Sequence, residues 1–249
     1  MEVHHHSHTA GKKWTHYFWE FLMLFLAVFC GYLAEYQLEH TIEHQREKKY
    51  AQSLLEDLKK DKADFNFQML WWKGIAGRID SIHEQLNKPA KERNSLLLYK
   101  EAGFIRMYNS FQYHDRTIEQ LKNAGNFRLL TKQNIADSLI DYDSEIKSRL
   151  RNIESVGNTI FTNINFLQDE IFDTRYFSLR ANDLILDSLL KVNPEIFNMV
   201  EGEKKKIFGY SNHLYFYKGN INIRLLIIQS LINKANKLIE MIGSEYQLK

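Results

Sequence analysis

Turn-forming residues are scarce in this sequence, which contains 2 prolines and 11 glycines among 249 residues. Together they make up about 5% of the chain, against roughly 12% in ordinary proteins. Few turns indicate long elements, and long elements of this composition are helices. The sequence therefore predicts an all-α fold.

Other absences exclude whole classes of function. Cys30 is the single cysteine, which excludes an internal disulfide and a cysteine-based zinc site. The 33 Lys+Arg nearly balance the 31 Asp+Glu, so the net charge of +2 gives no field that would bind nucleic acid. There is no phosphate loop, nucleophile elbow or dinucleotide fingerprint. We expect neither a cofactor nor enzymatic activity.

One apolar segment stands out against a mean hydropathy of −0.43, a value too low for a polytopic membrane protein. Residues 21–34, FLMLFLAVFCGYLA, carry no charge. Extended to Tyr17 and Tyr36, a helix here is about 30 Å long, which matches the hydrocarbon core of a bilayer. The sequence predicts a flexible His-rich tail at 1–13, a transmembrane anchor at 14–36 and a helical-bundle domain at 37–249.

The residues around the anchor predict that it is uncleaved and indicate its orientation. Tyr32 and Ala34 fit the small-residue pattern of a signal-peptide cleavage site badly. Lys12 and Lys13 lie close before the helix, whereas glutamates such as Glu35 crowd its far end. This asymmetry favours a cytoplasmic N-terminus, with the bundle outside the cytoplasm.

Three long apolar runs with steps of three and four, and occasionally seven, residues follow the anchor. They extend from Leu54 to Leu86, from Ile135 to Ile171 and from Ile221 to Tyr246. Such runs predict an antiparallel bundle of long helices, the first of which is able to continue directly from the anchor, although an intermolecular coiled coil would show the same pattern.

Punctuation residues mark where these helices should bend or end. We expect the first helix to end at Pro89 and to bend most easily at Gly74 and Gly77. Shorter helical pieces are expected at 95–108 and 110–124. Gly125 should end the second of them, and Thr131 should cap the next helix.

Within the anchor, one face differs from the rest. Ala27, Gly31 and Ala34 are small, and Glu20 falls on the same stripe as Ala27 and Gly31. Small residues let two helices approach closely, so this face is a candidate homo-oligomer interface, although scattered small residues in a lone anchor give the same pattern. A ring of Glu20 side chains would suit an ion-conducting or force-coupled assembly, and an interfacial glutamate is the simpler interpretation.

Two histidine clusters are candidate metal ligands. His40 and His44 lie four residues apart on one helix face beside Glu43, which matches the H-x-x-E-H pattern of inverted zinc peptidases. No third ligand can be assigned, so a metal-dependent hydrolase competes here with a simple solvated helix. His4, His5, His6 and His8 in the tail form the second candidate site.

Trp71 and Trp72 are adjacent, and neighbouring residues on a helix cannot both face one core. At least one of them should therefore lie at a surface, where a large aromatic side chain is typical of a partner-binding site.

The first 40 residues, followed by REKKYAQSLLEDLKKD, resemble a group of uncharacterised Bacteroidota membrane proteins that begin with a His-rich tail and one apolar helix. The segment TIEQLKNAGNFRLLTKQNIADSLIDY is similar to a helix-Gly-Asn-helix stretch in related single-anchor proteins. The resemblance implies residence in the cytoplasmic (inner) membrane, hence a periplasmic bundle, and it carries over no active residues.

These observations lead to one principal hypothesis. The chain is expected to be a non-enzymatic, membrane-anchored interaction or sensory module. Its expected partners are the lipid bilayer, a second copy of itself and a membrane or envelope protein that the sequence does not identify.

Overall fold

The computed structural model describes residues 14–248 except 124, 180–181 and 193–203. The described residues form helices and turns and contain no strand, which confirms the all-α fold. The chain divides into two compact units, Met1–Tyr50 and Ala51–Lys249. Helix α1 (Trp14–Leu86) contributes to both. The bundle unit thus begins at Ala51, later than the boundary at residue 37 that the sequence suggested.

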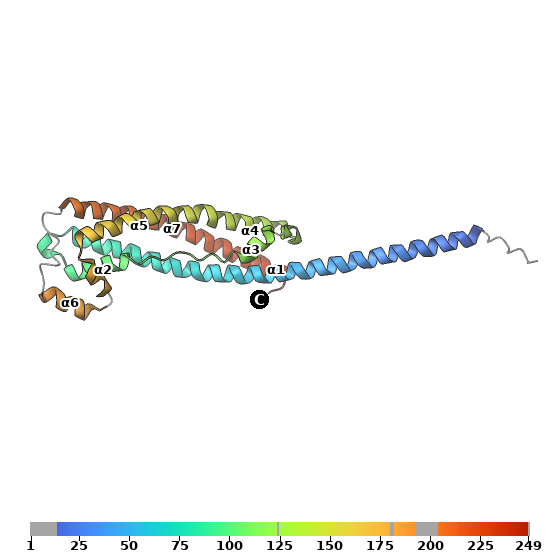
Figure 1. Ribbon diagram of the computed structural model, residues 1–249, viewed down its shortest axis with the longest axis horizontal. Helices are drawn as coiled ribbons and strands as arrows, with labels where there is room; N and C mark the ends of the chain where they lie inside the picture. Colours follow the sequence, from blue (N-terminus) through green and yellow to red (C-terminus); the bar gives the residue numbers. More distant parts are fainter. Residues whose placement is uncertain (1–13, 124, 180–181, 193–203, 249) are drawn as a thin grey trace, which may run out of the picture. The chain divides into compact units, whose positions relative to one another are not determined.

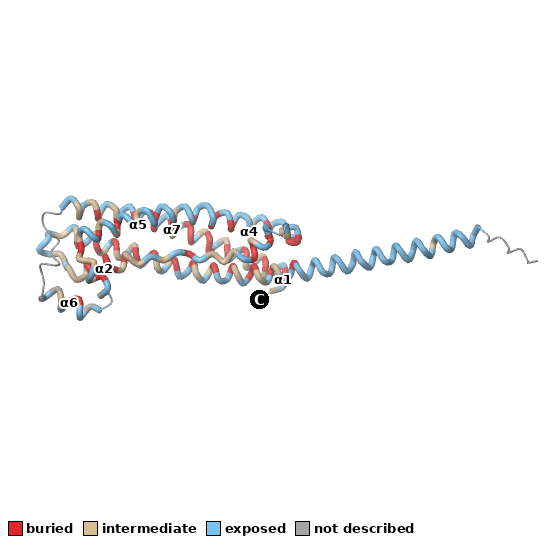
Figure 2. Tube along the Cα trace, viewed as in Figure 1, coloured by how far each residue is buried: buried red, intermediate tan, exposed pale blue. Residues whose placement is uncertain are grey.

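The first unit contains the described helical residues 14–50, nearly all of which are exposed (Figure 2). Trp14 is 84% exposed and Val28 is 74% exposed. The helix that carries them is long and apolar enough to cross a membrane, and its most apolar window has no buried residue. Exposed apolar surface of this extent is costly in water, so another apolar phase or surface must shield this segment from water.

Three long helical stretches form the second unit. They are the later part of α1, the continuous run of α4 (Gln133–Glu145), η3 (Ile146–Leu150) and α5 (Arg151–Ile171), and α7 (Lys204–Glu245). Helix α7 packs along both α4 and α5. Their inner faces supply the apolar core, which includes Phe65, Trp72, Ile79, Tyr142, Leu150, Ile164, Tyr217 and Ile228.

The directions of these helices can be followed in Figure 1. Helix α7 runs antiparallel to the other two, as expected. The bundle part of α1 and the α4–α5 run point the same way. Tyr142 bonds Asp61 at one level of the bundle, while Trp72 and Phe161, which are later in their helices, both contact Tyr108. Two parallel helices need a connection that travels back along their length, and the residues between α2 and α3 provide it.

The π-helical turn η3 has a clear packing role. Buried positions in this region recur every four residues, at Tyr142, Ile146, Leu150 and Glu154. An α-helix has 3.6 residues per turn, so a strict step of four would drift away from the core. The wider turn of a π-helix corrects this drift and keeps all four residues on the inner face.

The shorter elements are α2 (Ser95–Ile105), α3 (Arg116–Asn123), α6 (Asp183–Val192) and the 3-10 turns η1 (Ala90–Glu92), η2 (Asn126–Leu129) and η4 (Thr174–Leu179). Gly125 has φ = 62° and follows α3, as predicted for a left-handed stop. Helix α3 begins at Arg116, so the helical piece expected from residue 110 is wrong in its first part. The expected cap at Thr131 is also wrong, because Lys132 occupies the cap position of α4 without a side-chain hydrogen bond.

Candidate functional site

An extended segment, residues 107–115, returns from α2 to α3 alongside α1. We call it the strap. The polar groups of the strap, together with Thr117 just after it, pair with a row of α1 side chains, Asp57, Asp61, Asp64 and Gln68. Their spacing of four, three and four residues places them on one helix face. Extended backbone needs partners for its N–H groups, and here side chains replace the neighbouring strand of a sheet.

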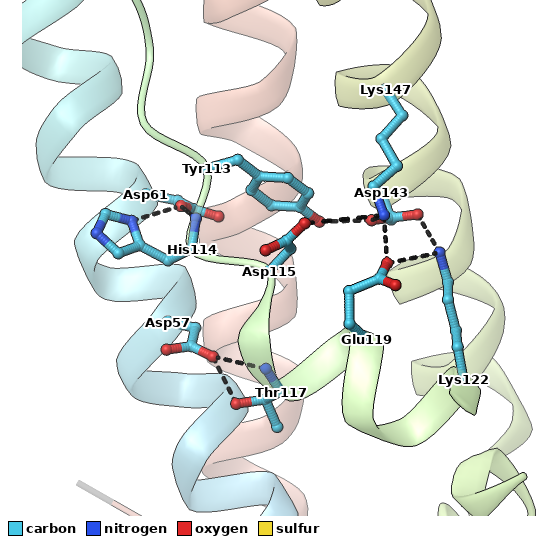
Figure 3. Close-up of polar contacts among 10 residues, drawn as sticks. All are labelled: Asp57, Asp61, Tyr113, His114, Asp115, Thr117, Glu119, Lys122, Asp143 and Lys147. Atoms are coloured by element: carbon cyan, nitrogen blue, oxygen red, sulfur yellow. Dashed lines mark hydrogen bonds and ion pairs between the residues drawn. The ribbon is translucent and has the colours of Figure 1, made fainter. Parts of the chain in front are cut away.

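The contacts occur in reverse order along the two segments, so the strap runs antiparallel to α1. Gln68 Nε2 donates to Asn109 Oδ1 at 3.1 Å, and Gln112 N donates to Asp64 Oδ2 at 3.0 Å. His114 N donates to Asp61 Oδ1 at 2.9 Å, and Thr117, in the first turn of α3, donates to Asp57 Oδ2 through its backbone N–H at 3.3 Å and through its hydroxyl (Figure 3).

Apolar contact also holds the strap in place. The ring of Phe111 stacks on that of Phe65 with centroids 4.1 Å apart and an interplanar angle of 9°. Both residues are buried, with 3% and 0% of their surface exposed. Phe111 N also donates to Glu154 Oε1 at 3.4 Å. The strap is therefore part of the core of the bundle.

Asp61 is the most buried carboxylate of the row, with 1% of its side chain exposed. It accepts hydrogen bonds from His114 N, His114 Nδ1 and Tyr142 Oη, each at 2.9 Å. Burial raises the pKa of Asp61 above its ordinary value, and the hydrogen bonds from His114 and Tyr142 oppose this shift only in part. Asp61 thus joins three elements: α1, the strap and α4.

Asp143 of α4 is the second acidic centre. It accepts a hydrogen bond from Tyr113 Oη at 2.9 Å and ion pairs with Lys122 and with Lys147, the latter at 3.1 Å. Burial alone would raise the pKa of Asp143, but the hydrogen bonds from Lys122, Lys147 and Tyr113 outweigh it and leave the pKa below its ordinary value. Glu119 also pairs with Lys147, which completes the cluster in Figure 3.

The protonation states in this cluster favour the hydrogen bonds and ion pairs that hold the strap region to α4. Burial and the neighbouring carboxylates raise the pKa of Tyr113 and of Tyr142, so both phenols stay neutral donors. The pKa of Lys147 is raised because its bonds to Glu119 and Asp143 outweigh burial, so this amine stays charged and is no nucleophile at neutral pH. The adjoining pocket, lined by Asp57, Asp61 and His114 among others, has room for about one water molecule.

A second buried polar group lies deeper in the bundle. Arg224 of α7 is 1% exposed, and its guanidinium carbon lies 4.0 Å from the ring centroid of Trp72. None of its three side-chain nitrogens has a hydrogen-bond partner in the part of the chain that the structure describes. Burial lowers the pKa of Arg224, and the charge of Glu154 opposes that shift. A Cβ atom added at Gly157 would lie 2.7 Å from Nη2 of Arg224, so this glycine makes room for the guanidinium.

The histidine clusters do not assemble a metal centre within the described residues. His40 and His44 lie on α1, and His44 Nδ1 is 3.6 Å from Glu47 Oε2. No group of three or more potential ligands comes together in the described ranges. His4, His5, His6 and His8 lie outside the described residues.

The candidate oligomer face of the anchor is open. Glu20, Ala27, Gly31 and Ala34 are all exposed, and a Cβ atom at Gly31 would meet nothing within 4 Å. Glu20 pairs with His16, one turn earlier, at 3.0 Å. This local pair is typical of a surface glutamate, and the interface itself stays a prediction.

The two tryptophans have different roles. Trp72 is 1% exposed and packs against Tyr217 and Arg224, so its assignment to a partner-binding surface is wrong: it is a core residue. Trp71 lies partly exposed beside Phe67 and Leu70, which are 51% and 73% exposed. Of the two, only Trp71 is placed to take part in partner binding.

The sequence interpretation missed the polar row on α1, although a signal for it is present. The apolar run steps by seven residues from Leu58 to Phe65 and again to Trp72. The core-facing positions inside those gaps are Asp61 and Gln68, both 1% exposed. A polar residue on an otherwise apolar stripe marks a buried polar site, which here is the attachment point of the strap.

Comparison with known proteins identifies no relative that shares this site. No protein-family model, no curated protein and no solved structure matches the chain. The candidate site therefore has to be interpreted from its own contacts, which describe a strap fixed to a helical bundle by carboxylates.

Proposed function

We propose that this chain is a non-enzymatic, single-pass membrane protein whose helical bundle serves as an interaction or sensory module. The exposed apolar surface of residues 14–36 carries the proposal, because a bilayer is the environment that suits a helix whose central residues 21–34 are apolar and uncharged. The polar cluster supports the non-enzymatic part: its acidic and basic groups are engaged with one another and border a pocket of about one water molecule.

Membrane extraction tests the anchor. The full chain should stay in the membrane pellet at alkaline pH and be released by detergent. Replacing Leu24 and Val28 with Arg should release the protein, since each Arg costs about 2.5–3.5 kcal/mol at the centre of a membrane helix. Phe166→Arg is the matched control, because Phe166 is exposed on α5 in the bundle unit and lies outside the proposed partner surface. Release of the unmodified chain without detergent would refute the anchor.

The proposed location is the cytoplasmic membrane, with the N-terminal tail inside and the bundle in the periplasm. The basic residues before the helix support this orientation, as does the resemblance of the first 40 residues to inner-membrane proteins. The bundle would then meet envelope proteins and other extracytoplasmic ligands.

The proposed partner surface is the outer face of α1 at Phe67, Leu70 and Trp71, which presents apolar side chains in a domain with its own complete core. Site-specific photo-crosslinking at residue 70 in living cells should give a discrete adduct with a membrane or envelope protein. The variant Trp71→Ala should reduce that adduct. Phe166→Ala, a change at a 70% exposed residue of α5, is the control that should leave it intact. Equal yields from both variants would exclude this surface.

A further inference from the structure

The outer face of α7 carries a second apolar surface, separate from the one on α1. Five large apolar side chains are open to solvent within 19 residues of this helix: Phe208 (68% exposed), Tyr215 (73%), Phe216 (71%), Ile223 (51%) and Leu226 (72%). At about 100° per residue they fall within one arc of roughly 100°. The buried residues Tyr217 and Ile228 point the opposite way. We call this arc the α7 outer face.

Gly219 lies in the middle of the α7 outer face, and no contact among the described residues requires a glycine there. A Cβ atom at this position would meet no atom within 4 Å. A glycine inside a helix costs about 0.5–1 kcal/mol relative to alanine. A small residue between large ones leaves a shallow notch that lets a second helix approach closely. The arrangement therefore suits the packing of a helix from another molecule against α7.

The surface is large enough for a stable contact. With roughly 200 Å² for a fully exposed large side chain, the five exposed fractions amount to about 650–700 Å². A standard interface buries about 800 Å² on each partner, and the largest apolar patch on an ordinary monomer covers about 300–600 Å². Few additional atoms at the rim would complete an interface.

The chemistry of the face favours a copy of itself as its occupant. The arc from Phe208 to Leu226 contains aromatic, aliphatic, asparagine and glycine residues and no charge. A partner with a charged surface would leave its charges unpaired and buried here, whereas an isologous contact places the same uncharged patch on both sides. We propose that two copies of this chain associate through the α7 outer face, with Gly219 of each copy near the centre of the contact.

Disulfide crosslinking of the full chain in native membranes tests this proposal. In a Cys30→Ala background, Gly219→Cys should form an oxidised dimer several-fold faster than Asn163→Cys, an exposed position on α5. Adding Leu226→Lys should slow the Gly219→Cys reaction about tenfold or more, because burying an unpaired ammonium costs more than 1.4 kcal/mol. All three positions are exposed, so these variants should fold.

Three outcomes would overturn the proposal. Equal rates at residues 219 and 163 would show no specific contact. Crosslinking that persists with Leu226→Lys but is lost with Gly31→Ile would assign the proximity to the anchor. Protection of residue 219 from a soluble maleimide without a dimer would assign the face to a different occupant. Since none of these results alters membrane extraction or photo-crosslinking at residue 70, the proposed function stands or falls separately.

Discussion

Removing the carboxylate of Asp61 should loosen the strap and destabilise the whole bundle. Asp61→Ala leaves His114 N and Tyr142 Oη without acceptors in a site that is 1% exposed on the Asp61 side. Each unsatisfied buried donor costs about 1–3 kcal/mol, so a loss of about 3–5 kcal/mol is expected once the small cavity is included. For a unit of this size, that corresponds to a fall in Tm of about 6–20 °C.

Two matched variants distinguish the loss of this buried acceptor from the loss of a hydrogen bond at the surface. Asp61→Asn keeps an accepting oxygen and should cost clearly less than Asp61→Ala. Asp64→Ala removes an acceptor for one partly exposed N–H, that of Gln112, and should cost about 1 kcal/mol or less. Tyr142→Phe combined with Asp61→Ala should cost less than the sum of the two, because both changes break the same bond.

Circular dichroism melts of the detergent-purified full chain at pH 7 measure these differences directly. The reasoning predicts the order Asp61→Ala, then Asp61→Asn, then Asp64→Ala, from the largest to the smallest loss. If the melting temperatures of Asp61→Ala and Asp64→Ala agree within about 2 °C, their stabilities differ by less than about 1 kcal/mol. That result would refute the role of Asp61 as the residue that fixes the strap to the bundle.

Two further predictions concern packing and pH. Gly157→Ala should lower the stability by about 1–2 kcal/mol in thermal melts, because its Cβ atom would lie 2.7 Å from both Arg224 Nη2 and Asn220 Oδ1. Gly74→Ala, where the new Cβ atom meets open space, should instead raise the stability by up to about 1 kcal/mol. Equal effects of the two variants would contradict the steric argument. The pKa of Asp143 is lowered from 3.8, so its contribution is present above that value and is lost as the pH falls through the folded-state pKa. Melts between pH 6 and pH 2.5 should therefore show a shallower acid loss for Asp143→Asn, and parallel curves would contradict this.

The helices could be predicted from the sequence because their signals are local. Apolar spacing marked the long helices, and Gly125 marked the stop after α3 through its need for a left-handed backbone. The end of α1 at Leu86, before Pro89, follows from the restriction that proline places on preceding residues. Each of these features depends on a few neighbouring residues.

The strap could not be predicted, because its stability comes from residues far away in the chain. Residues 110–115 of the strap have no strand pattern, and their partners Asp61 and Asp64 are more than 45 residues distant. Buried polar residues such as Arg224 disappear from an analysis that counts only apolar positions. For the strap, the gaps in the apolar steps at Asp61 and Gln68 were the available signal, and they mark the candidate site.

The most direct test of a membrane-spanning anchor with an extracytoplasmic bundle is the sidedness of two single cysteines. Both are placed in a Cys30→Ala background, one at Ser7 in the tail and one at Lys91, an exposed residue of η1. Intact spheroplasts are treated with a membrane-impermeant maleimide. The account predicts labelling at residue 91 before lysis and at residue 7 only after lysis. Labelling of both residues under the same condition would contradict a single membrane span, and the reverse pattern would place the bundle in the cytoplasm.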